Sequence, residues 1–481
     1  MGGRSLAVLM TLCLGGVGCA VGPDFHRPAA PTVTGYTPEP ATATAPADGK
    51  RQRFIEGQPI ADFWELLRCR PLDSIVRNAL ANNPGLEAAR ATLRRSQDTL
   101  RAGYGVFFPQ LDARAGASRQ RYNPAPGALP SDTFNLFTLS GSVSYEIDIW
   151  GGARRQAEVL GAAVDEQRYA LAGAYIMLAS NVVDAVIAQA AYRDEIDATK
   201  ATVLLLREQL RIALAQATGG TVPYSNVLAL ESQVASTSAT VPPLEQKIDQ
   251  ADHLLAALSG LETVKWQRPS LALSDFQLPE DLPLTLPSQL VRQRPDILMA
   301  EADLHAANAN IGVATAAMLP NLTLSANYGG NNTAAGDLFA AGSVFWSLGA
   351  GLTQPIFHGG TLYFQRKAAV DARDSAVAEY RQTVLQAFQE VADGLRRLSH
   401  DADALAAQSE AVETAEKAIH LIQANYQAGI ATYLQVLVAD GQYLQAKIGY
   451  VQAVAQRLQD VIALYVALGG GWWNAPAASH G

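Results

Sequence analysis

The chain has 481 residues, of which 49% are hydrophobic and only 17% charged, and its formal net charge is −9. This composition is too apolar for a disordered chain and too poor in basic residues for a nucleic-acid-binding protein. The length allows two or more domains, or two interleaved copies within one body.

Residues 1–18 are predicted to be a signal peptide. Arg4 precedes an apolar run over residues 6–14 that is too short to cross a membrane as a helix. The GVGC sequence that ends at Cys19 resembles the cleavage site of bacterial lipoproteins, which implies that Cys19 is lipidated. Lipoproteins retained at the inner membrane typically have an Asp directly after the cysteine, and Ala20 stands there instead, so the implied location is the outer membrane. The alternative is an ordinary signal peptide with an incidental cysteine.

Residues 19–70 are predicted to form an extended, lipid-anchored tether followed by the start of an equatorial region. This segment is rich in Pro, Ala and Thr and shows no hydrophobic periodicity. Cys69 would be the one free thiol, because Cys13 leaves with the signal peptide and Cys19 is acylated. A lone thiol with no nearby His in the sequence is expected to be a buried small apolar residue rather than a nucleophile.

The rest of the chain contains a long internal repeat. Three landmarks recur at offsets of 208 to 211 residues: Pro84 and Pro109 as Pro295 and Pro320, Trp150-Gly151-Gly152 as His358-Gly359-Gly360, and Gly220-x3-Tyr224 as Gly429-x3-Tyr433. This pattern indicates a duplicated half-protein rather than a short solenoid unit. Repeat 1 covers residues 71–261 and repeat 2 residues 291–468, with a connecting segment over 262–290 and a tail over 469–481.

Each repeat contains two predicted strands in which apolar and polar residues alternate. These strands cover residues of about 108–120 and 134–149 in repeat 1, and about 319–330 and 343–357 in repeat 2. A soluble sheet with one wet face would show the same alternation. A sheet that faces lipid must close into a barrel, which needs about eight strands or more. The membrane interpretation therefore requires an oligomer, with eight strands from two chains or twelve from three.

The remaining segments are predicted to be long helices. Their expected ranges are 153–217 followed by 226–258 in repeat 1, and 362–428 followed by 435–468 in repeat 2. A helix of residues 362–428 would be about 100 Å long at ~1.5 Å per residue. Each long helix ends at a glycine signal, Gly219-Gly220 or Gly429, after which the next helix returns alongside it.

Several motifs occur together in a characteristic order. They are the Cys19 lipobox, the GPDFHRP sequence after it, Asp62-Phe63-Trp64, the paired Pro-x24-Pro segments, QPIFHGG at 354–360, AFQEVADGL at 387–395 and the Gly-x3-Tyr-x2-Val-Leu turns. Together these features resemble the NodT-type efflux lipoproteins, which are TolC-like outer-membrane factors.

The resemblance implies a mainly α-helical fold with a transmembrane β part. In such a homotrimer each protomer gives four strands to a 12-stranded β-barrel, which a long periplasmic α-helical barrel continues. An equatorial belt would use residues 54–72, 262–287 and those beyond 469. The implied function is passive conduction, across the outer-membrane lipid, of compounds that an inner-membrane pump exports through a periplasmic adaptor. The pump is expected to be of the resistance-nodulation-division class. Alternatives are a duct for protein secretion and a lipid-anchored periplasmic coiled-coil scaffold.

The resemblance also implies where the pore closes and where the adaptor binds. Leu434 occupies a position where relatives carry a ring of apolar residues, and Asp440 is the nearest acidic residue, so both are candidate periplasmic gate residues. The alternative assigns Leu434 to seam packing and Asp440 to a solvated face. Val438 and Gly441 replace an Asp and an Arg of some relatives, which argues against a salt-bridged latch. The predicted adaptor contacts lie in the two turns: Gly219, Gly220, Tyr224, Gly429 and Tyr433.

Enzymatic functions find little support in the sequence. The seven histidines form no HExxH pattern and no Cys/His cluster with metal spacing, so no metal site or cofactor is expected. The chain also contains neither the glycine-rich loop that binds ATP phosphates nor a Gly-x-Ser-x-Gly elbow. His358 precedes two glycines, but its match to Trp150 in the repeat favours a structural role at a strand-to-helix junction.

Overall fold

The computed structural model describes residues 20–39, 42–47, 49, 51–122 and 132–474. The predicted signal peptide, the lipidation site Cys19 and the end of the tail lie outside these residues. The chain divides into two compact units. One comprises Met1–Pro28, Thr92–Arg168 and Met299–Arg381, and the other comprises Ala29–Ala91, Tyr169–Leu298 and Gln382–Gly481.

The described residues form a mainly helical fold with two small sheets. The α-helices are α2 Arg70–Asn82, α3 Pro84–Gly103, α4 Gly152–Thr218, α5 Tyr224–Ser238, α6 Val241–Leu258, α7 Pro287–Leu290, α8 Pro295–Ala316, α9 Thr361–Gln427 and α10 Tyr433–Ala467. The strands are β1 Arg53–Glu56, β2 Gln110–Tyr122, β3 Asp132–Ile147, β4 Asp281–Leu284, β5 Asn321–Asn332 and β6 Val344–Thr353. Both repeats thus contain the predicted succession of helix, two strands, long helix and return helix.

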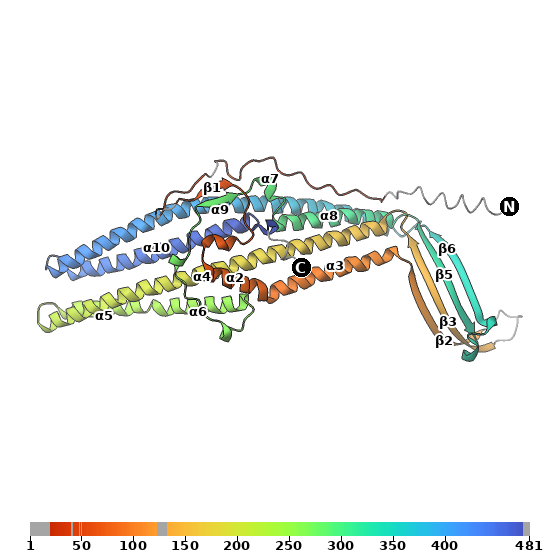
Figure 1. The fold of residues 1–481 in the computed structure, drawn as a ribbon, viewed down its shortest axis with the longest axis horizontal. Helices are drawn as coiled ribbons and strands as arrows, with labels where there is room; N and C mark the ends of the chain where they lie inside the picture. Colours follow the sequence, from red (N-terminus) through yellow and green to blue (C-terminus); the bar gives the residue numbers. More distant parts are fainter. Residues whose placement is uncertain (1–19, 40–41, 48, 50, 123–131, 475–481) are drawn as a thin grey trace. The chain divides into compact units, whose positions relative to one another are not determined.

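The four long strands form one antiparallel sheet in the first unit, in the order β2-β3-β5-β6 (Figure 1). Each strand lies within a few residues of its predicted range. The largest difference is in the strand predicted over 343–357, which ends at Thr353. Pro355 has no backbone N–H to donate to a ladder, which is consistent with the chain leaving the sheet just before it.

The two long helices, α4 and α9, each have 67 residues. By length and composition α4 is the one helix among the described residues that would be able to cross a membrane, but half of its most apolar stretch is buried within the protein, as in a core helix. The return helix predicted over 226–258 is wrong as one continuous helix, because it is divided into α5 and α6 at Ala239 and Thr240. Pro242 and Pro243 lie in the first turn of α6. Proline has no backbone N–H, so in a continuous helix neither residue could donate a hydrogen bond to the preceding turn, whereas at the start of a helix no such bond is required.

Aromatic residues form part of the core of the second unit. Phe63 and Trp64 are fully buried, and the Phe63 ring stacks on Tyr465 of α10 with centroids 6.3 Å apart. The indole Nε1 of Trp64 donates a hydrogen bond to Asp73 at 3.0 Å. Cys69 is buried beside this core, as expected, and burial raises the pKa of its thiol.

Three segments that are far apart in the sequence meet in the second unit. β1 pairs in parallel with β4, which joins the N-terminal segment to the connection between the repeats. At the other end of the chain, Trp473 donates to Gln58 at 3.2 Å and Asn474 donates to the Pro59 carbonyl at 2.9 Å. These are the segments assigned to the equatorial belt in the sequence, and the belt itself stays a prediction.

Carboxylates from three helices gather beside this region of the second unit. Asp401 of α9 is half-buried against Asp460 of α10, and Asp460 lies near Asp184 of α4. Arg397 and Arg457 partly balance this charge. Burial, followed by hydrogen bonding to Asp460 and repulsion from its charge, raises the pKa of Asp401 to about 7.

This pKa predicts that the protein loses stability as the pH rises. A carboxyl group whose pKa is higher in the folded chain than its ordinary value near 4 binds its proton more tightly when folded. Its stabilising contribution is therefore complete below about pH 4 and is lost as the pH rises through about 7. Asp401→Asn, which imitates the protonated form, should melt at a higher temperature than the wild type at pH 8.

The measurement is thermal unfolding of the detergent-purified protein by circular dichroism between pH 5 and pH 8. Asp403→Asn, which removes an exposed carboxylate from the same helix, is the matched control. A wild-type melting temperature that does not fall with pH, or an equal gain in both variants, would show that Asp401 carries no raised pKa.

Candidate functional site

The register of the sheet collects the apolar residues of all four strands on one face. Val143 of β3 lies opposite Leu111 of β2 and Ala326 of β5, and Tyr328 lies opposite Trp346 of β6. In the single chain this face is uncovered: Trp346 is 70% exposed and Leu111 76% exposed. A contiguous apolar face of this kind requires an apolar environment or a partner.

The opposite face of the sheet is polar. Ser140, Ser142 and Ser144 alternate with the apolar residues of β3, and Asp112 and Arg114 lie opposite them on β2. Strands with apolar residues on one side and polar residues on the other are the pattern of transmembrane barrels, in which the polar side lines the lumen.

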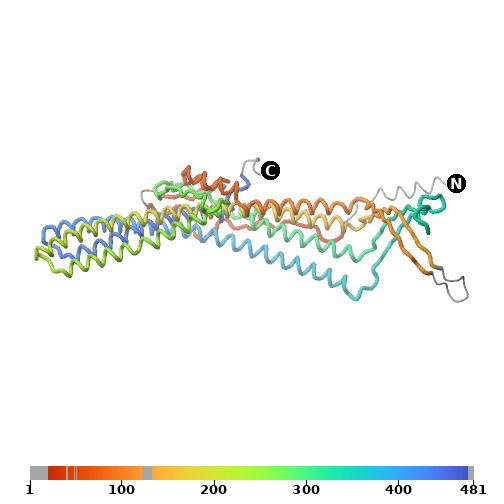
Figure 2. The backbone as a smooth tube through the Cα atoms, turned by 90° about the horizontal axis from the view of Figure 1, so that it is seen from below, coloured from red at the N-terminus to blue at the C-terminus, as the bar shows by residue number. Residues whose placement is uncertain are grey.

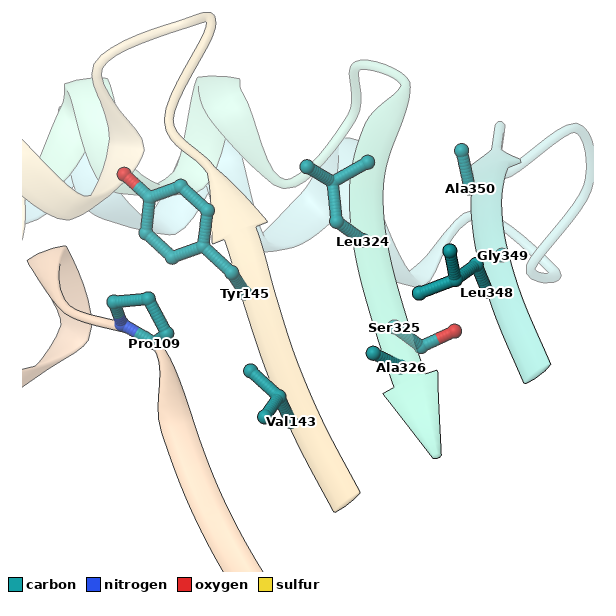
Figure 3. A pocket seen from close by; sticks show the side chains of 9 residues that line it. All are labelled: Pro109, Val143, Tyr145, Leu324, Ser325, Ala326, Leu348, Gly349 and Ala350. Carbon is teal, nitrogen blue, oxygen red and sulfur yellow. The ribbon is translucent and has the colours of Figure 1, made fainter. Parts of the chain in front are cut away.

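A hollow of about 510 Å³ lies on the apolar face of the sheet (Figure 3). It is lined mainly by Val143, Tyr145, Leu324, Ala326 and Leu348 and by no charged side chain. A surface of this chemistry suits hydrocarbon chains rather than a polar substrate. Among the described residues, no group of three or more His, Cys, Asp or Glu side chains is arranged to hold a metal ion.

The turn after each long helix is built on a glycine with left-handed backbone geometry. Gly220 has φ 74° and Gly429 has φ 76°, a region that side chains with a Cβ rarely adopt. In each turn the next amide bonds back to the last helical residues, from Thr221 to the Gln216 carbonyl at 2.9 Å and from Ile430 to the Asn425 carbonyl at 2.8 Å. These are the helix stops that the glycine signals predicted.

The two turns lie side by side in the second unit, at the ends of the α4–α5 and α9–α10 hairpins (Figure 2). A hydrophobic cluster joins the hairpins. Its buried members are Leu206, Ala213, Val227, Leu230 and Tyr433.

The tyrosines that the repeat makes equivalent have opposite environments. Tyr224 of the first turn is 59% exposed, whereas Tyr433 of the second turn is only 9% exposed and packs edge-on against Tyr426. Of the residues predicted to contact an adaptor, Gly219, Gly220, Tyr224 and Gly429 are thus available at the surface, and Tyr433 holds the hairpins together.

The two candidate gate residues are also in different environments. Leu434 is 66% exposed, but Asp440 is only 3% exposed, so Asp440 is not on a solvated face. Gln209 of α4 donates to the Asp440 carboxylate at 2.9 Å, and Gln423 of α9 is a second hydrogen-bond partner. Burial raises the pKa of Asp440, and the two hydrogen bonds oppose that rise. The sequence analysis did not identify Gln209 or Gln423 as partners of Asp440. The one local signal for them is that each is a polar residue on a mainly apolar face of its helix.

The GPDFHRP motif belongs to the first unit and packs near the start of α4. Arg155 is buried there and donates to the Asp24 carboxylate at 2.6 Å. The Phe25 ring stacks on His305 of α8 with centroids 4.3 Å apart, and Asn308 donates to the Pro23 carbonyl at 2.9 Å. These contacts fix the segment that directly follows Cys19 in the sequence.

Comparison with known proteins identifies this architecture. The family model of the outer membrane efflux protein matches residues 75–261 and 286–470. The chain belongs to this family. It is an outer-membrane channel component of an efflux system.

Related efflux proteins match along almost the whole chain. The pyoverdine export outer membrane protein OpmQ of Pseudomonas aeruginosa is 32% identical over 450 residues, which cover 91% of this chain and 94% of OpmQ. The cation efflux system protein CusC of Escherichia coli is 28% identical over 470 residues, covering 95% of this chain and 96% of CusC. The solved structure of the outer-membrane channel OprN has the same fold, with a TM-score of 0.85 at 24% identity, covering 94% of this chain and 100% of OprN.

The different burial of the two turn tyrosines predicts different effects of their removal. Tyr433→Ala in this efflux protein should lower the free energy of local opening of the second hairpin by about 3 kcal/mol, which is the usual cost of deleting a buried aromatic ring. Tyr224→Ala should change it by less than about 0.5 kcal/mol, because most of that ring is already in solvent. Native-state hydrogen exchange of the amides over 420–440 measures the difference, and similar exchange in both variants would contradict it.

Proposed function

We propose that this chain forms a homotrimer whose twelve strands close one β-barrel, through which compounds delivered by an inner-membrane pump pass without further energy input. The observation that carries the proposal is the four-stranded sheet, which has an uncovered apolar face. Among the described residues, one side of β2 and one side of β6 have no neighbouring strand. Unpaired backbone groups are too costly in lipid, so the two edges must pair with other copies.

The described residues of one copy contribute four strands to this sheet, so three copies supply twelve, which is enough to close a barrel. The polar residues Ser140, Ser142 and Ser144 would then line the lumen, and Trp346 and Leu348 would face lipid. A periplasmic scaffold has no need for such a face, which disfavours that alternative. Migration of an unheated sample as a trimer in detergent gels, and as a monomer after boiling, tests the assembly.

The compounds conducted are proposed to be small molecules or metal ions rather than proteins. The names of the relatives support this class, because they refer to pyoverdine, toluene and cations. Their diversity gives no reason to choose one compound, since a wide duct selects little. We propose that the pump is of the resistance-nodulation-division class and that a periplasmic adaptor connects it to this channel.

A lipid anchor at Cys19 forms a further part of the proposal. The contacts of Asp24 and Phe25 with α4 and α8 support it, because they tie the residues just after Cys19 to the unit that contains the membrane-facing sheet. The mass of the N-terminal peptide of the mature protein tests this assignment. A free or absent cysteine there would exclude the anchor.

Closure of the pore is proposed to occur at the second hairpin. Leu434 is exposed beside the turn, where copies related by the trimer axis would bring their leucines together. Asp440 would act differently from a ring of exposed charges. Its buried hydrogen bond with Gln209 holds α10 against α4, so it would keep the hairpin in the closed position.

Replacement of these residues should widen the channel. Leu434→Ser removes apolar contacts at the constriction, and Asp440→Ala removes the link to Gln209, so each should increase single-channel conductance in planar bilayers several-fold. Leu228→Ser is the matched control, because it makes the same change at a 52% exposed leucine beside the first turn. Conductance that stays at the wild-type level in both variants would remove the two residues from the gate.

The adaptor is proposed to bind the exposed surface of both turns. Cysteines introduced at Thr221 and Ile430, which are exposed beside Gly220 and Gly429, should cross-link to the adaptor in whole cells. Val264→Cys is the control, since Val264 is 87% exposed but lies between the repeats. The native Cys69 is buried and should not react. Cross-linking from position 264 but from neither turn would refute this contact.

A further inference from the structure

The membrane-facing side of β2 ends in two arginines. Side chains alternate along a strand, so Arg119 and Arg121 continue the row that begins with Leu111 and includes Ala117. The register places Arg119 opposite Asn135. Both arginines are exposed, and they lie at the end of the sheet where β2 connects to β3, away from the strand ends that lead to the helices.

Their height on the sheet can be estimated from the apolar band. On β3 this band runs from Ile147 to Phe137, and Phe137 lies opposite Ala117. Ten residues at ~3.4 Å each, tilted by ~40°, give a band about 26 Å high, close to the ~25 Å of outer-membrane barrels. Arg119 and Arg121 then lie about 5 and 10 Å beyond the hydrocarbon edge, which is the level of the lipid headgroups.

Charge on the strands is distributed unequally between the two faces. Asp112 and Glu146 occupy register positions on the polar face, together with Arg114. The membrane-facing positions within residues 111–121, 133–147, 322–332 and 344–352 carry no carboxylate. Among these strand positions, the charged residues at the outer end of the membrane-facing side are therefore Arg119 and Arg121, even though the whole chain has a net charge of −9.

We propose that Arg119 and Arg121 bind the phosphate groups of lipid A, the phosphorylated glycolipid of the outer leaflet. This inference rests on the proposed function, which places the helices in the periplasm and the β2–β3 connection at the outer surface. A guanidinium group can donate two parallel hydrogen bonds to a phosphate, and its aliphatic stem can lie along the apolar face below. Three copies would place six such arginines around one barrel.

Binding of lipid A to the purified full-length trimer tests the proposal. Each basic residue near an anionic lipid surface contributes about fivefold to binding, so Arg119→Gln with Arg121→Gln should weaken binding about 25-fold. Arg114→Gln, the matched control on the polar face of the same strand, should leave binding unchanged. Dephosphorylated lipid A with the same acyl chains should bind wild type and double variant equally, and inorganic phosphate should not displace lipid A.

The wild-type protein gives a second readout that needs no variant. Its affinity for lipid A should fall as salt rises from 50 to 500 mM, and its affinity for the dephosphorylated lipid should not. Equal binding of both lipids, or an equal loss in Arg114→Gln and the double variant, would overturn the proposal. Binding of lipid A by the double variant at wild-type strength would overturn it as well.

Trimer migration and bilayer conductance of the same preparations separate this inference from the proposed function. A double variant that migrates as a trimer and conducts like the wild type but loses lipid A supports the inference. A wild-type protein that neither migrates as a trimer nor conducts contradicts the proposed function itself.

Discussion

The unpaired edges of the four-stranded sheet are the constraint on which the rest of this protein depends. β2 and β6 each have one edge that no other strand in the described part of the chain pairs with, next to a face that is apolar from Leu111 to Trp346. Exposing the apolar face to water is unfavourable, and exposing the unpaired backbone groups of the edges to lipid is also unfavourable. Only closure with further copies satisfies both at once. A channel built from several copies is thus required by the hydrogen-bonding needs of the strands.

The duplication supplies the elements of such a channel twice, but the copies are not equivalent in packing. Tyr224 and Tyr433 hold the same place in their repeats, yet only Tyr433 is covered by the other hairpin. The first turn consequently exposes its aromatic ring at the surface of the chain. The second turn uses its ring to join the hairpins. Packing between the two repeats therefore gives the two turns different environments, although both long helices end at a glycine with the same backbone geometry.

Features that depend on local periodicity could be predicted from the sequence, whereas features that depend on distant partners could not. The faces of the strands and the stops at Gly220 and Gly429 follow from alternation and backbone geometry, and the structure confirms them. The division of the return helix into α5 and α6 was not predicted, although Pro242 and Pro243 stand at the start of α6. The burial of Asp440 had no local signal, because Gln209 is 231 positions away in the chain.

The link between Asp440 and Gln209 sets an energetic requirement for any movement of the second hairpin. A partly buried hydrogen bond to a charged group contributes roughly 1.5–3 kcal/mol, and after its loss Gln423 would be the remaining partner of the Asp440 carboxylate. Moving α10 away from α4 would break this bond and uncover the cluster around Tyr433 at the same time. Thermal fluctuations alone would populate such a state rarely. Under the closure proposed above, a partner that binds the exposed turns would have to favour the separated arrangement by at least that amount to open the pore.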